Sequence, residues 1–235
     1  KGRMLEPDEI VARLISYFNP DLPLKGKRVL ITTGPTYEAI DPVRFIGNHA
    51  SGKMGFVLAE VAASLGAEVQ LITGPTHEKI NHPSVAVQAV VSAKEMFLAV
   101  KKEYKRSDIA IAAAAVADFT PQSVAPQKLK KGKSNLSLSL IPTEDILAYM
   151  GKNKKKHRLI GFALETENEL ENAKIKLKQK NLDGIVLNSL QDPGAGFSVS
   201  TNKITFIHSD HSIQTFPLQS KLECAHRIFE QILSL

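Results

Sequence analysis

The residues best suited to chemistry lie in the segment 47–55, which reads Gly-Asn-His-Ala-Ser-Gly-Lys-Met-Gly. This segment nearly matches the phosphate-binding pattern G-x-x-x-x-G-K-[ST], but Met54 stands where a magnesium-binding hydroxyl is required. Small residues that open a helix still leave backbone N–H groups unpaired at the positive end of the helix dipole, which suits phosphate. We therefore expect a phosphate site unlike that of a standard nucleoside triphosphatase. A helix start eased by glycine for packing is the alternative.

Other candidate residues follow strand-like segments. Residues 32–36 place hydroxyls and a turn glycine after the first such segment. Residues 112–118 are small and end in the carboxylate of Asp118, so a ligand could approach the backbone there, although tight packing of a buried strand explains the alanines equally well. Residues 125–131 carry three lysines, which would neutralise charge developing at a phosphorus if this loop closed over a substrate. Exposed lysines usually have no such role.

Histidine and cysteine give weaker signals. His49 has no carboxylate fixed near it by the sequence, so a loop histidine is the simpler interpretation, and the remaining His residues show no metal-ligand spacing. Cys224 is the only cysteine, which excludes an intramolecular disulfide, and its place in a helical pattern predicts a packed thiol. The residues alone leave any metal site unknown.

Composition narrows the class of protein. The chain has 235 residues, of which 43% are hydrophobic, and no apolar run approaches the roughly 20 residues needed to cross a bilayer. Residues 1–7 lack the apolar centre of a signal peptide, so we expect a cytoplasmic protein with no membrane partner. The net charge of +6 favours anionic partners. The basic runs at 101–102 and 152–156 are not interleaved with aromatic residues, so we expect no nucleic-acid partner.

The elements that must hold these candidates alternate between strand and helix. Strand patterns occupy residues 28–33, 67–73, 85–91, 109–113, 159–163 and 185–187. Helical patterns occupy residues 7–18, 93–105, 144–150 and 167–180, and further helices begin near Ser51 and at Lys221. The alternation predicts an α/β fold, in which ligands gather beyond the carboxyl ends of the strands.

The expected fold is Rossmann-like, with a mostly parallel sheet, helices on both faces and a C-terminal β-hairpin extension. The hairpin is predicted from residues 203–207 and 212–216, which are joined by the polar turn Ser209-Asp210-His211. Residues 119–139, which contain proline, glycine and many lysine and serine residues, predict a mobile loop. The connection after the first strand is unusually long.

Ordered motifs across nearly the whole chain resemble one family. They are residues 31–36 (ITTGPT), 41–55 (DPVRFIGNHASGKMG), 114–119 (AAVADF), 125–131 (APQKLKK) and 161–166 (GFALET). By these motifs the sequence is similar to phosphopantothenoylcysteine synthetase, also called phosphopantothenate–cysteine ligase. It resembles the bacterial type that forms the C-terminal half of a bifunctional synthetase–decarboxylase of coenzyme A biosynthesis. The resemblance implies that residues 1–24 are an N-terminal helix and linker from a fused flavin-dependent phosphopantothenoylcysteine decarboxylase domain, and that residues 25–235 form the synthetase domain.

The family joins 4'-phosphopantothenate to L-cysteine and in most bacteria uses CTP and Mg²⁺. The reaction passes through an acyl-cytidylate, which the cysteine amine attacks, and releases CMP and pyrophosphate. The resemblance further implies a homodimer in which Arg44 reaches the neighbouring subunit's site. Because a carboxylate must meet the α-phosphate while several negative charges are held together, we expect positioning and cation clamps to dominate over proton transfer.

The resemblance also assigns roles to individual residues. Asn48 would hold the acyl intermediate, and Lys128 would lie on the loop that closes over the nucleotide, so these are the expected catalytic residues. The expected nucleotide-binding residues are Gly34, Arg44, Ser51, Gly52, Gly55, Asp118, Lys128, Thr143, Glu144, Asp145, Ile146, Phe162, Lys176, Lys180 and Asn188. Asn48, Ala114 and Ala115 would bind phosphopantothenate, and magnesium would be held mainly through the nucleotide phosphates.

Two positions of the phosphate segment stand apart from this assignment. Ala50 replaces the serine usual in the family, which removes one hydroxyl from the expected phosphate contacts. We expect the backbone donors to compensate for its loss. Lys53 receives no role from the resemblance.

Two alternatives belong to other classes of protein. The strand–helix–strand start suggests a dinucleotide-binding regulatory or redox module, but only Gly52 and Gly55 lie near its fingerprint and no acidic residue follows Thr73. The net charge by itself suggests a nucleic-acid-binding domain. Binding of NAD(H) against CTP would test the first alternative, and salt-sensitive DNA binding without cytidylate turnover would favour the second.

Overall fold

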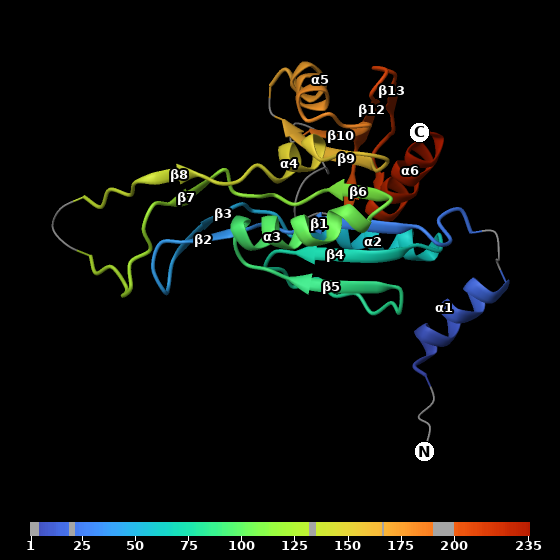
Figure 1. Ribbon diagram of the computed structural model, residues 1–235, viewed down its shortest axis with the longest axis horizontal. Coiled ribbons are helices and arrows are strands. Elements are labelled where there is room, and N and C mark those ends of the chain that lie inside the picture. The colour runs from blue at the N-terminus through green and yellow to red at the C-terminus, as the bar shows by residue number, and fades with distance from the viewer. Residues whose placement is uncertain (1–4, 19–21, 132–134, 166, 190–199) are drawn as a thin grey trace.

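The computed structural model describes residues 5–18, 22–131, 135–165, 167–189 and 200–235. The helices are α1 (Pro7–Phe18), α2 (Lys53–Ser64), α3 (Ala93–Glu103), α4 (Ile146–Lys152), α5 (Glu169–Gln179) and α6 (Lys221–Ser234). The main sheet contains β1 (Arg28–Thr33), β4 (Glu68–Thr73), β5 (Val85–Ala89), β6 (Ile109–Ala112), β9 (Arg158–Glu165), β10 (Gly184–Ser189), β12 (Ile204–His208) and β13 (Ile213–Thr215). Figure 1 shows this sheet at the centre of the molecule.

The strand order of the sheet is β13-β12-β10-β9-β6-β1-β4-β5. The strands from β5 to β10 run parallel, and β12 and β13 add an antiparallel hairpin at one edge. When the six parallel strands are numbered by their order in the chain, they lie across the sheet in the order 3-2-1-4-5-6, which is the doubly wound order of the Rossmann fold. The order reverses between β1 and β6, so a ligand crevice is expected beyond the carboxyl ends of those two strands.

Buried apolar side chains alternate between the two faces of the sheet. On β1, Val29 and Ile31 join the cluster that contains α2 and α6, whereas Leu30 joins the cluster beneath α3, α4 and α5. Successive side chains of a strand point to opposite faces, so a strand covered on both sides must be apolar throughout. Burying each such side chain contributes roughly 1.5–3 kcal/mol relative to exposure. The two helical layers therefore fix β1 rigidly beneath the crevice.

Local signals define where several helices begin. The side chains of Ser92 and Asp145 accept hydrogen bonds from backbone N–H groups in the first turns of α3 and α4. Ser220 and Glu223 form a capping box at the start of α6. The helix expected near Ser51 begins at Lys53, one residue after Gly52, whose φ of 83° is left-handed.

The expected α/β architecture, its parallel sheet and the C-terminal hairpin are confirmed. The long first connection contains a hairpin of β2 (Tyr37–Ala39) and β3 (Phe45–Gly47), which the sequence analysis did not predict. The segment expected to be only a loop carries β7 (Phe119–Pro121), which pairs with β8 (Leu140–Pro142). A further short pair joins β11 (Thr201–Asn202) to β14 (Gln219–Ser220).

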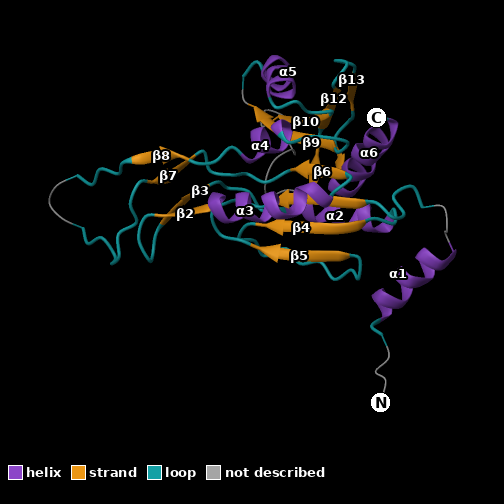
Figure 2. Ribbon diagram, in the orientation of Figure 1, coloured by secondary structure: helices purple, strands orange, loops and turns teal. Residues whose placement is uncertain are grey.

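The β2–β3 and β7–β8 pairs form an arm that projects from the carboxyl side of the sheet, at the left of Figure 2. The rings of Tyr37 and Phe45 stack on this arm with their centroids 3.8 Å apart. Val43, Phe45 and Phe119 are each at least half exposed there. The arm therefore offers apolar surface outside the main core.

The N-terminal helix α1 lies beside the body, near the opposite end of the sheet from the arm (Figure 1). Residues 1–4 of the expected domain junction lie outside the described residues. Among the described helices, none combines the length and apolar character required to cross a membrane.

Candidate functional site

A cavity of about 510 Å³ opens beyond the carboxyl ends of β1 and β6. It lies where the strand order reverses, as the fold predicts. Its lining residues are Thr33, Gly34, Gly47, Asn48, His49, Ala50, Ser51, Gly52, Lys53, Met54, Gly55, Ala113, Ala114, Ala115, Val116, Phe162, Ala163, Leu164, Lys176, Asn188, Asn202 and Lys221. The cavity thus brings together segments from all parts of the domain.

The expected phosphate loop is held directly against the end of β1. The Thr33 hydroxyl donates a hydrogen bond to the Gly52 carbonyl at 2.7 Å. A side chain at Gly55 would overlap Thr33, and a Cβ at Gly52 would lie 3.2 Å from the Gly34 Cα. Glycine is therefore required here for close approach of the loop to the strand, and at Gly52 also for its positive φ.

A second hydroxyl holds the loop from the next strand. Thr76, which follows β4, donates a hydrogen bond from its hydroxyl to the Ser51 carbonyl at 2.6 Å. Lys53 and Met54, the first two residues of α2, line the cavity together with this loop. An anion in this part of the cavity would meet the positive end of the α2 dipole.

Asn48 lies against the alanine segment that follows β6. Its side-chain amide donates to the carbonyls of Ala115 at 3.0 Å and Val116 at 3.3 Å. Asn48, Ala114 and Ala115 all line the cavity. The structure therefore brings together the three residues expected to bind phosphopantothenate.

The residues expected to surround the nucleotide divide into two groups. Gly34, Ser51, Gly52, Gly55, Phe162, Lys176 and Asn188 line the cavity itself. Asp118, Thr143, Glu144, Asp145, Ile146 and Lys180 are not among its lining residues. Lys176 joins the two groups, because it lines the cavity, its ammonium donates to the Phe162 carbonyl at 2.9 Å, and it lies on the same helix as Lys180.

The second group forms a polar ledge, which we define as Asp118, Thr143, Glu144, Asp145, Ile146 and Lys180. The Thr143 amide donates to the Asp118 carbonyl at 2.9 Å, and Lys180 forms an ion pair with Asp145. Burial alone would raise the pKa of Asp145. The bonds from Lys180 and from the Ala148 amide outweigh this effect and lower the pKa below its ordinary value. Asp145 is therefore ionised at neutral pH.

Arg44 and Lys128 lie on the arm and not on the cavity wall. The guanidinium of Arg44 pairs with the buried carboxylate of Asp41 and donates to the Leu129 carbonyl at 2.7 Å. The Leu129 amide also donates to Asp41 at 3.1 Å. The Arg44 bond is the main cause that holds the pKa of Asp41 well below its usual range. This Asp41–Arg44–Leu129 clamp fixes the chain next to Lys128.

Two cavity residues were not predicted from the sequence. Asn202 is the second residue of β11, and its side-chain amide donates to the Asn188 side-chain oxygen at 3.2 Å. Lys221 is the first residue of α6 and is only 4% exposed. The capping-box pattern at residues 220–223 predicts where α6 starts, but nothing local indicates that its first side chain reaches a ligand cavity.

The remaining reactive side chains agree with the simpler interpretations. Cys224 is buried, its thiol donates to the Asn202 carbonyl at 3.5 Å, and burial raises its pKa. The packed thiol is therefore confirmed. His49 lines the cavity from an exposed loop position. Within the described part of the chain, no cluster of three or more His, Cys, Asp or Glu side chains could hold a metal ion.

Comparison with known proteins agrees with the geometry. Residues 24–235 match the family described as "DNA/pantothenate metabolism flavoprotein C-terminal domain". The chain is 45% identical over 239 residues to the "Coenzyme A biosynthesis bifunctional protein CoaBC" of Bacillus subtilis (strain 168), and the match covers 100% of this chain and 58% of the relative. It is 52% identical over 240 residues to a "Cysteine/Cysteine sulfinic acid decarboxylase" of an unknown prokaryotic organism, covering 100% of this chain and 67% of that protein.

A solved structure shows the same fold. The crystal structure of the C-terminal domain of a coenzyme A biosynthesis bifunctional protein CoaBC superposes with a TM-score of 0.77 at 41% identity. The superposition covers 91% of this chain and 97% of that domain. The chain spans 58–67% of the two curated relatives it matches, so it corresponds to one part of such proteins. The resemblance seen in the motifs is thus confirmed, and the chain belongs to the family of the DNA/pantothenate metabolism flavoprotein C-terminal domain.

Proposed function

We propose that this domain joins 4'-phosphopantothenate to L-cysteine and uses CTP to activate the carboxylate as an acyl-cytidylate. The observation that carries the proposal is that one cavity is lined both by the phosphate loop at Ser51 and Gly52 and by Asn48, Ala114 and Ala115. A role in coenzyme A biosynthesis is further supported by the name of the Bacillus subtilis relative.

The proposed reaction has two steps. A carboxylate oxygen of phosphopantothenate attacks the α-phosphorus of CTP, and the bond between the α-phosphorus and the oxygen bridging to the β-phosphate breaks, which releases pyrophosphate. The cysteine amine then attacks the acyl carbon, the bond to the cytidylate oxygen breaks, and the amine loses a proton as CMP leaves. Both steps bring negative groups together, so the residues must chiefly orient the reactants and offset charge.

Asn48 is suited to the acyl side of this reaction. Its amide is neutral and already lies 3.0 Å from the Ala115 carbonyl, at the wall formed by the alanine segment. An amide that donates to acyl and phosphoryl oxygens stabilises them without adding a charge that would attract water. We assign Asn48 to binding the acyl-cytidylate and the small residues Ala114 and Ala115 to admitting the phosphopantothenate chain.

The nucleotide would lie between the phosphate loop and the polar ledge. Gly34, Ser51, Gly52 and Gly55 border the phosphate side, and Phe162, Lys176 and Asn188 border the far wall of the cavity. The ledge residues Asp118 and Thr143 to Ile146 then supply contacts to the base, and Lys180 supports them through Asp145. This arrangement supports a nucleotide held at both ends.

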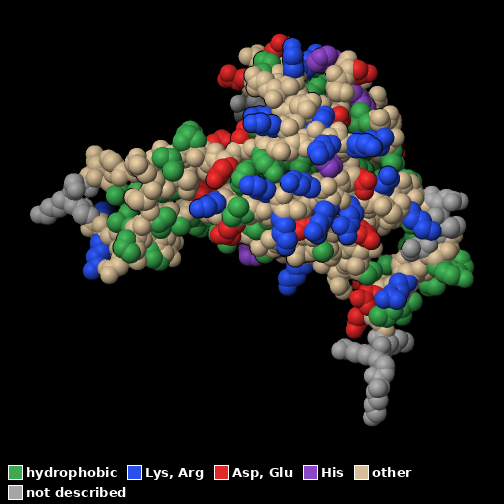
Figure 3. Space-filling view, in the orientation of Figure 1, with side chains coloured by type: hydrophobic (Ala, Val, Ile, Leu, Met, Phe, Trp, Pro, Cys, Tyr) green, Lys and Arg blue, Asp and Glu red, His purple; other side chains and the backbone are tan. Residues whose placement is uncertain are grey.

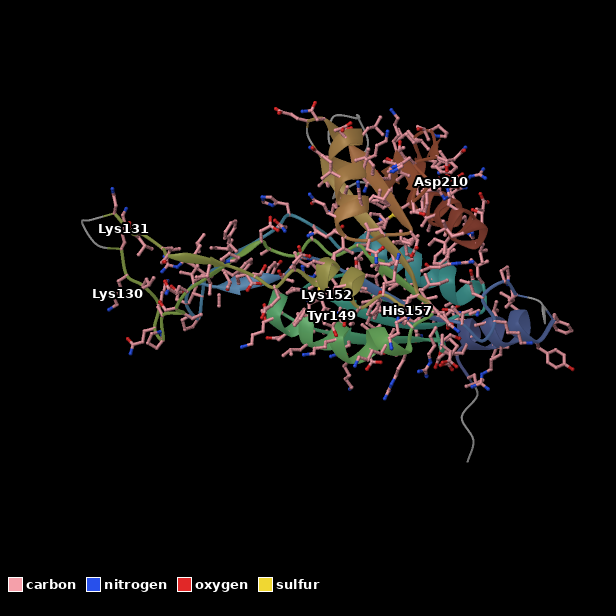
Figure 4. The ribbon with its side chains drawn as sticks, turned by 45° about the horizontal axis from the view of Figure 1, so that its top comes forward. Lys130, Lys131, Tyr149, Lys152, His157 and Asp210 are labelled. Atoms are coloured by element: carbon pink, nitrogen blue, oxygen red, sulfur yellow. The ribbon has the colours of Figure 1, made fainter. Side chains whose placement is uncertain are left out.

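Lys128 is proposed to close over the nucleotide from the arm. The Asp41–Arg44–Leu129 clamp fixes the backbone beside Lys128, so its ammonium would be presented from a defined position. A cation placed there during the first step would offset charge on the phosphates. Lys130 and Lys131 lie on the arm at a distance from the sheet (Figure 4), so they are not given this role.

We also propose that two copies of the chain pair through the arm. The exposed apolar side chains of Val43, Phe45, Phe119, Leu140 and Ile141 suit burial against a second copy. In such a dimer, residues of the clamp, including Arg44, would approach the neighbouring site. Within one chain, the Arg44 guanidinium is engaged by Asp41 and the Leu129 carbonyl.

Magnesium fits the cavity only as an ion carried by the nucleotide. The lining residues include hydroxyls, amides and lysines but no carboxylate among those that the structure describes. Mg²⁺ prefers carboxylate and phosphate oxygens and retains several of its waters. The donor set therefore supports Mg²⁺ bound mainly to phosphates, where it would offset their charge.

One observation supports the alternative of a dinucleotide-binding module, namely the strand order of the sheet. Against it, β4 ends at Thr73 and is followed by Gly74 and Pro75, with no acidic residue to bind a ribose. Figure 3 shows Lys and Arg side chains spread over the central body with acidic side chains between them on this face, which also favours a small anion over nucleic acid.

The decarboxylase named in one relative concerns a longer protein. This chain spans 67% of that relative, and we propose that a fused decarboxylase part would account for the remainder of such proteins. The cavity described above offers a phosphate loop, which ligation needs and decarboxylation of free cysteine does not. Release of CO₂ from cysteine by this domain alone would indicate that the domain itself is a decarboxylase.

The direct test is release of CMP and pyrophosphate by the purified domain with Mg²⁺. We expect release to require CTP, 4'-phosphopantothenate and L-cysteine together, and mass spectrometry to detect the condensed product. Omission of cysteine should leave an acyl-cytidylate that can be trapped with hydroxylamine. Nucleotide turnover that ignores phosphopantothenate in well-folded protein would contradict the proposal.

A further inference from the structure

The peptide unit between Ser51 and Gly52 is held by a residue that does not itself line the cavity. Thr76 follows β4, is half-buried, and is not among the cavity-lining residues. Its hydroxyl donates to the Ser51 carbonyl at 2.6 Å, and a Cβ placed at Gly52 would lie 3.4 Å from the same hydroxyl oxygen. Thr76 therefore packs directly against the phosphate loop.

The proton of the Thr76 hydroxyl has a defined direction. The Glu78 amide donates to the Thr76 hydroxyl oxygen at 3.1 Å. A hydroxyl has one proton, so an oxygen that accepts from Glu78 can direct its own proton to the Ser51 carbonyl. The bond to Ser51 is thus the second in a chain of hydrogen bonds that starts at a backbone amide. In such a chain each bond polarises the next.

The following carbonyl of the loop is fixed as well. The Gly52 carbonyl accepts from the Thr33 hydroxyl at 2.7 Å and from the Gly55 amide at 3.0 Å. Two successive peptide units are therefore tied by two threonine hydroxyls, one at the end of β1 and one after β4. Neither peptide unit can turn without breaking a hydrogen bond.

Fixing the Ser51 carbonyl also fixes the N–H of Gly52. The C=O and N–H of a planar trans peptide point in opposite directions, and the described chain contains no cis peptide. The Gly52 N–H therefore points away from Thr76. It has no hydrogen-bond acceptor among the described residues, and Gly52 lines the cavity. An anion bound in the cavity could supply the missing acceptor.

We propose that Thr76 is a positioning residue, which acts through the Ser51–Gly52 peptide to aim the Gly52 N–H at a phosphate of the nucleotide. This inference rests on the proposed function, which supplies the nucleotide. Thr76 does not touch the ligand. It orients the donor before the anion binds, so the donor does not need to be reoriented later. The bond to the Ser51 carbonyl also polarises the shared amide and makes its N–H a stronger donor.

The proposal predicts that phosphate binding depends on the hydroxyl of Thr76. Thr76→Val keeps the branched shape of the side chain and loses only the hydroxyl. Its affinity for pyrophosphate should fall roughly threefold to tenfold, the size expected for one neutral hydrogen bond. Thr76→Ser keeps the hydroxyl and should bind pyrophosphate like the wild type. Isothermal titration of pyrophosphate into the chain, with Mg²⁺ present, measures these affinities.

The matched control is Thr73→Val. Thr73 is the last residue of β4, and its hydroxyl also donates to a backbone carbonyl, that of Gly74 at 2.9 Å. Thr73 is not among the residues that line the cavity. This variant loses the same kind of bond close by, so we expect both valine variants to lose stability and only Thr76→Val to lose affinity for pyrophosphate.

The Ser51–Gly52 peptide can also be observed directly. Gly52 is the only one of the 14 glycines that follows a serine in the sequence. Cell-free synthesis with serine labelled at its carbonyl carbon by ¹³C and with ¹⁵N-glycine therefore gives a single HNCO signal, which belongs to this peptide. We expect the signal of the wild type to move as pyrophosphate is added. In Thr76→Val it should start at a different position and move less.

Three outcomes of the titrations would overturn the inference. Wild-type affinity in Thr76→Val would exclude a positioning role. An equal loss in Thr73→Val would indicate a general effect of removing a hydroxyl near the end of β4, and an equal loss in Thr76→Ser would assign the effect to the methyl group. If circular dichroism shows that Thr76→Val does not fold, the wild-type HNCO signal decides. A signal that stays unchanged at saturating pyrophosphate would refute the contact with phosphate.

Failure of the proposed function would look different. If pyrophosphate moves the Gly52 signal and Thr76→Val weakens binding, but no cysteine-dependent turnover is found, the positioning role stands and the ligase assignment fails. If turnover requires all three substrates and Thr76→Val binds pyrophosphate normally, the ligase assignment stands and the positioning role fails.

Discussion

At the scale of single residues, the site depends on how closely backbone segments approach one another. Gly55 faces the Thr33 side chain, and the Thr33 hydroxyl donates to the Gly52 carbonyl, so only this one side chain separates strand β1 from the phosphate loop. Such contact fixes the direction of the loop amides before a ligand arrives. Preorganised donors of this kind are more effective than flexible ones, because they do not need to be reoriented during the reaction.

Asn48 provides the sharpest prediction at this scale. In Asn48→Asp the carboxylate would face the carbonyls of Ala115 and Val116, which now accept hydrogen bonds from the amide. We expect kcat for the condensation to fall by about a hundredfold or more, with CTP affinity nearly unchanged, because a donor to the reacting group is lost. Stopped-flow or quench assays with titration of CTP binding would measure both quantities.

The control for Asn48→Asp is Asn153→Asp. The Asn153 amide also donates to a backbone carbonyl, that of Tyr149 at 2.8 Å, but it lies at the end of α4 and away from the cavity. This variant should keep normal turnover. A wild-type rate in Asn48→Asp would remove Asn48 from the proposed reaction.

At the scale of elements, the clamp ties the β2–β3 hairpin to the segment beside Lys128. In Asp41→Asn, the ion pair with Arg44 is lost and the bond from the Leu129 amide is weakened. We expect faster hydrogen exchange at Leu129, and acyl-cytidylate formation slower by roughly tenfold to a hundredfold because Lys128 is less well placed. Mass-spectrometric exchange and single-turnover assays would detect these changes.

The same carboxylate predicts a dependence on pH. The pKa of Asp41 is lower in the folded protein than the ordinary value of about 3.9. The stability that the ionised carboxylate gives to the clamp is therefore fully present above that ordinary value. It is lost as the pH falls through the lower pKa of the folded protein. Titration of Asp41 should therefore not change the opening of the clamp that hydrogen exchange at the Leu129 amide measures between pH 5 and 8. The control Asp210→Asn, in the β12–β13 turn, should leave the arm unchanged. An arm that opens equally in both variants would contradict the clamp.

The elements differ in how far the sequence predicts them. Strand β1 and helix α6 are predicted because a run of apolar residues and a helical pattern that begins at Lys221 are local signals. The short strands of the arm are not predicted, because each has three residues and gains stability only from its partner. Lys221 is missed for the same reason, since its place in the cavity depends on the packing of α6 against α2.

The family motifs identified candidate site residues correctly in some cases, but they did not show which of these residues line the cavity. Gly34, Asn48 and Gly52 meet in the cavity because their motifs end or follow strands at the carboxyl edge of the sheet. The ledge residue Asp145 and the arm residue Lys128 were expected at the same site, but they lie outside the cavity lining. A motif indicates that a residue has a role in the family, but it does not show how far that residue lies from the cavity in this chain.

At the scale of the whole molecule, the projecting arm predicts the oligomeric state. We expect light scattering to give twice the 25.7 kDa of one chain. In Phe45→Asp, a charge replaces a half-exposed ring that stacks on Tyr37. The dissociation constant of the dimer should therefore rise at least about tenfold. Sedimentation at several concentrations would measure the change.

Leu98→Asp is the control for the dimer. Leu98 is similarly exposed but lies on α3, outside the arm. This variant should remain dimeric. A wild-type domain that sediments as a monomer, or a dimer that is lost equally in both variants, would contradict pairing through the arm.

The placement of Lys221 has a consequence for synthesis of the chain. Ribosomes make α6 after every strand of the sheet, and α6 supplies both Lys221 and the buried side chains of Ile228 and Phe229. A nascent chain would therefore acquire the phosphate loop early and the part of the cavity wall at Lys221 late. Ligand binding in this cavity would then report that α6 has been made and has docked.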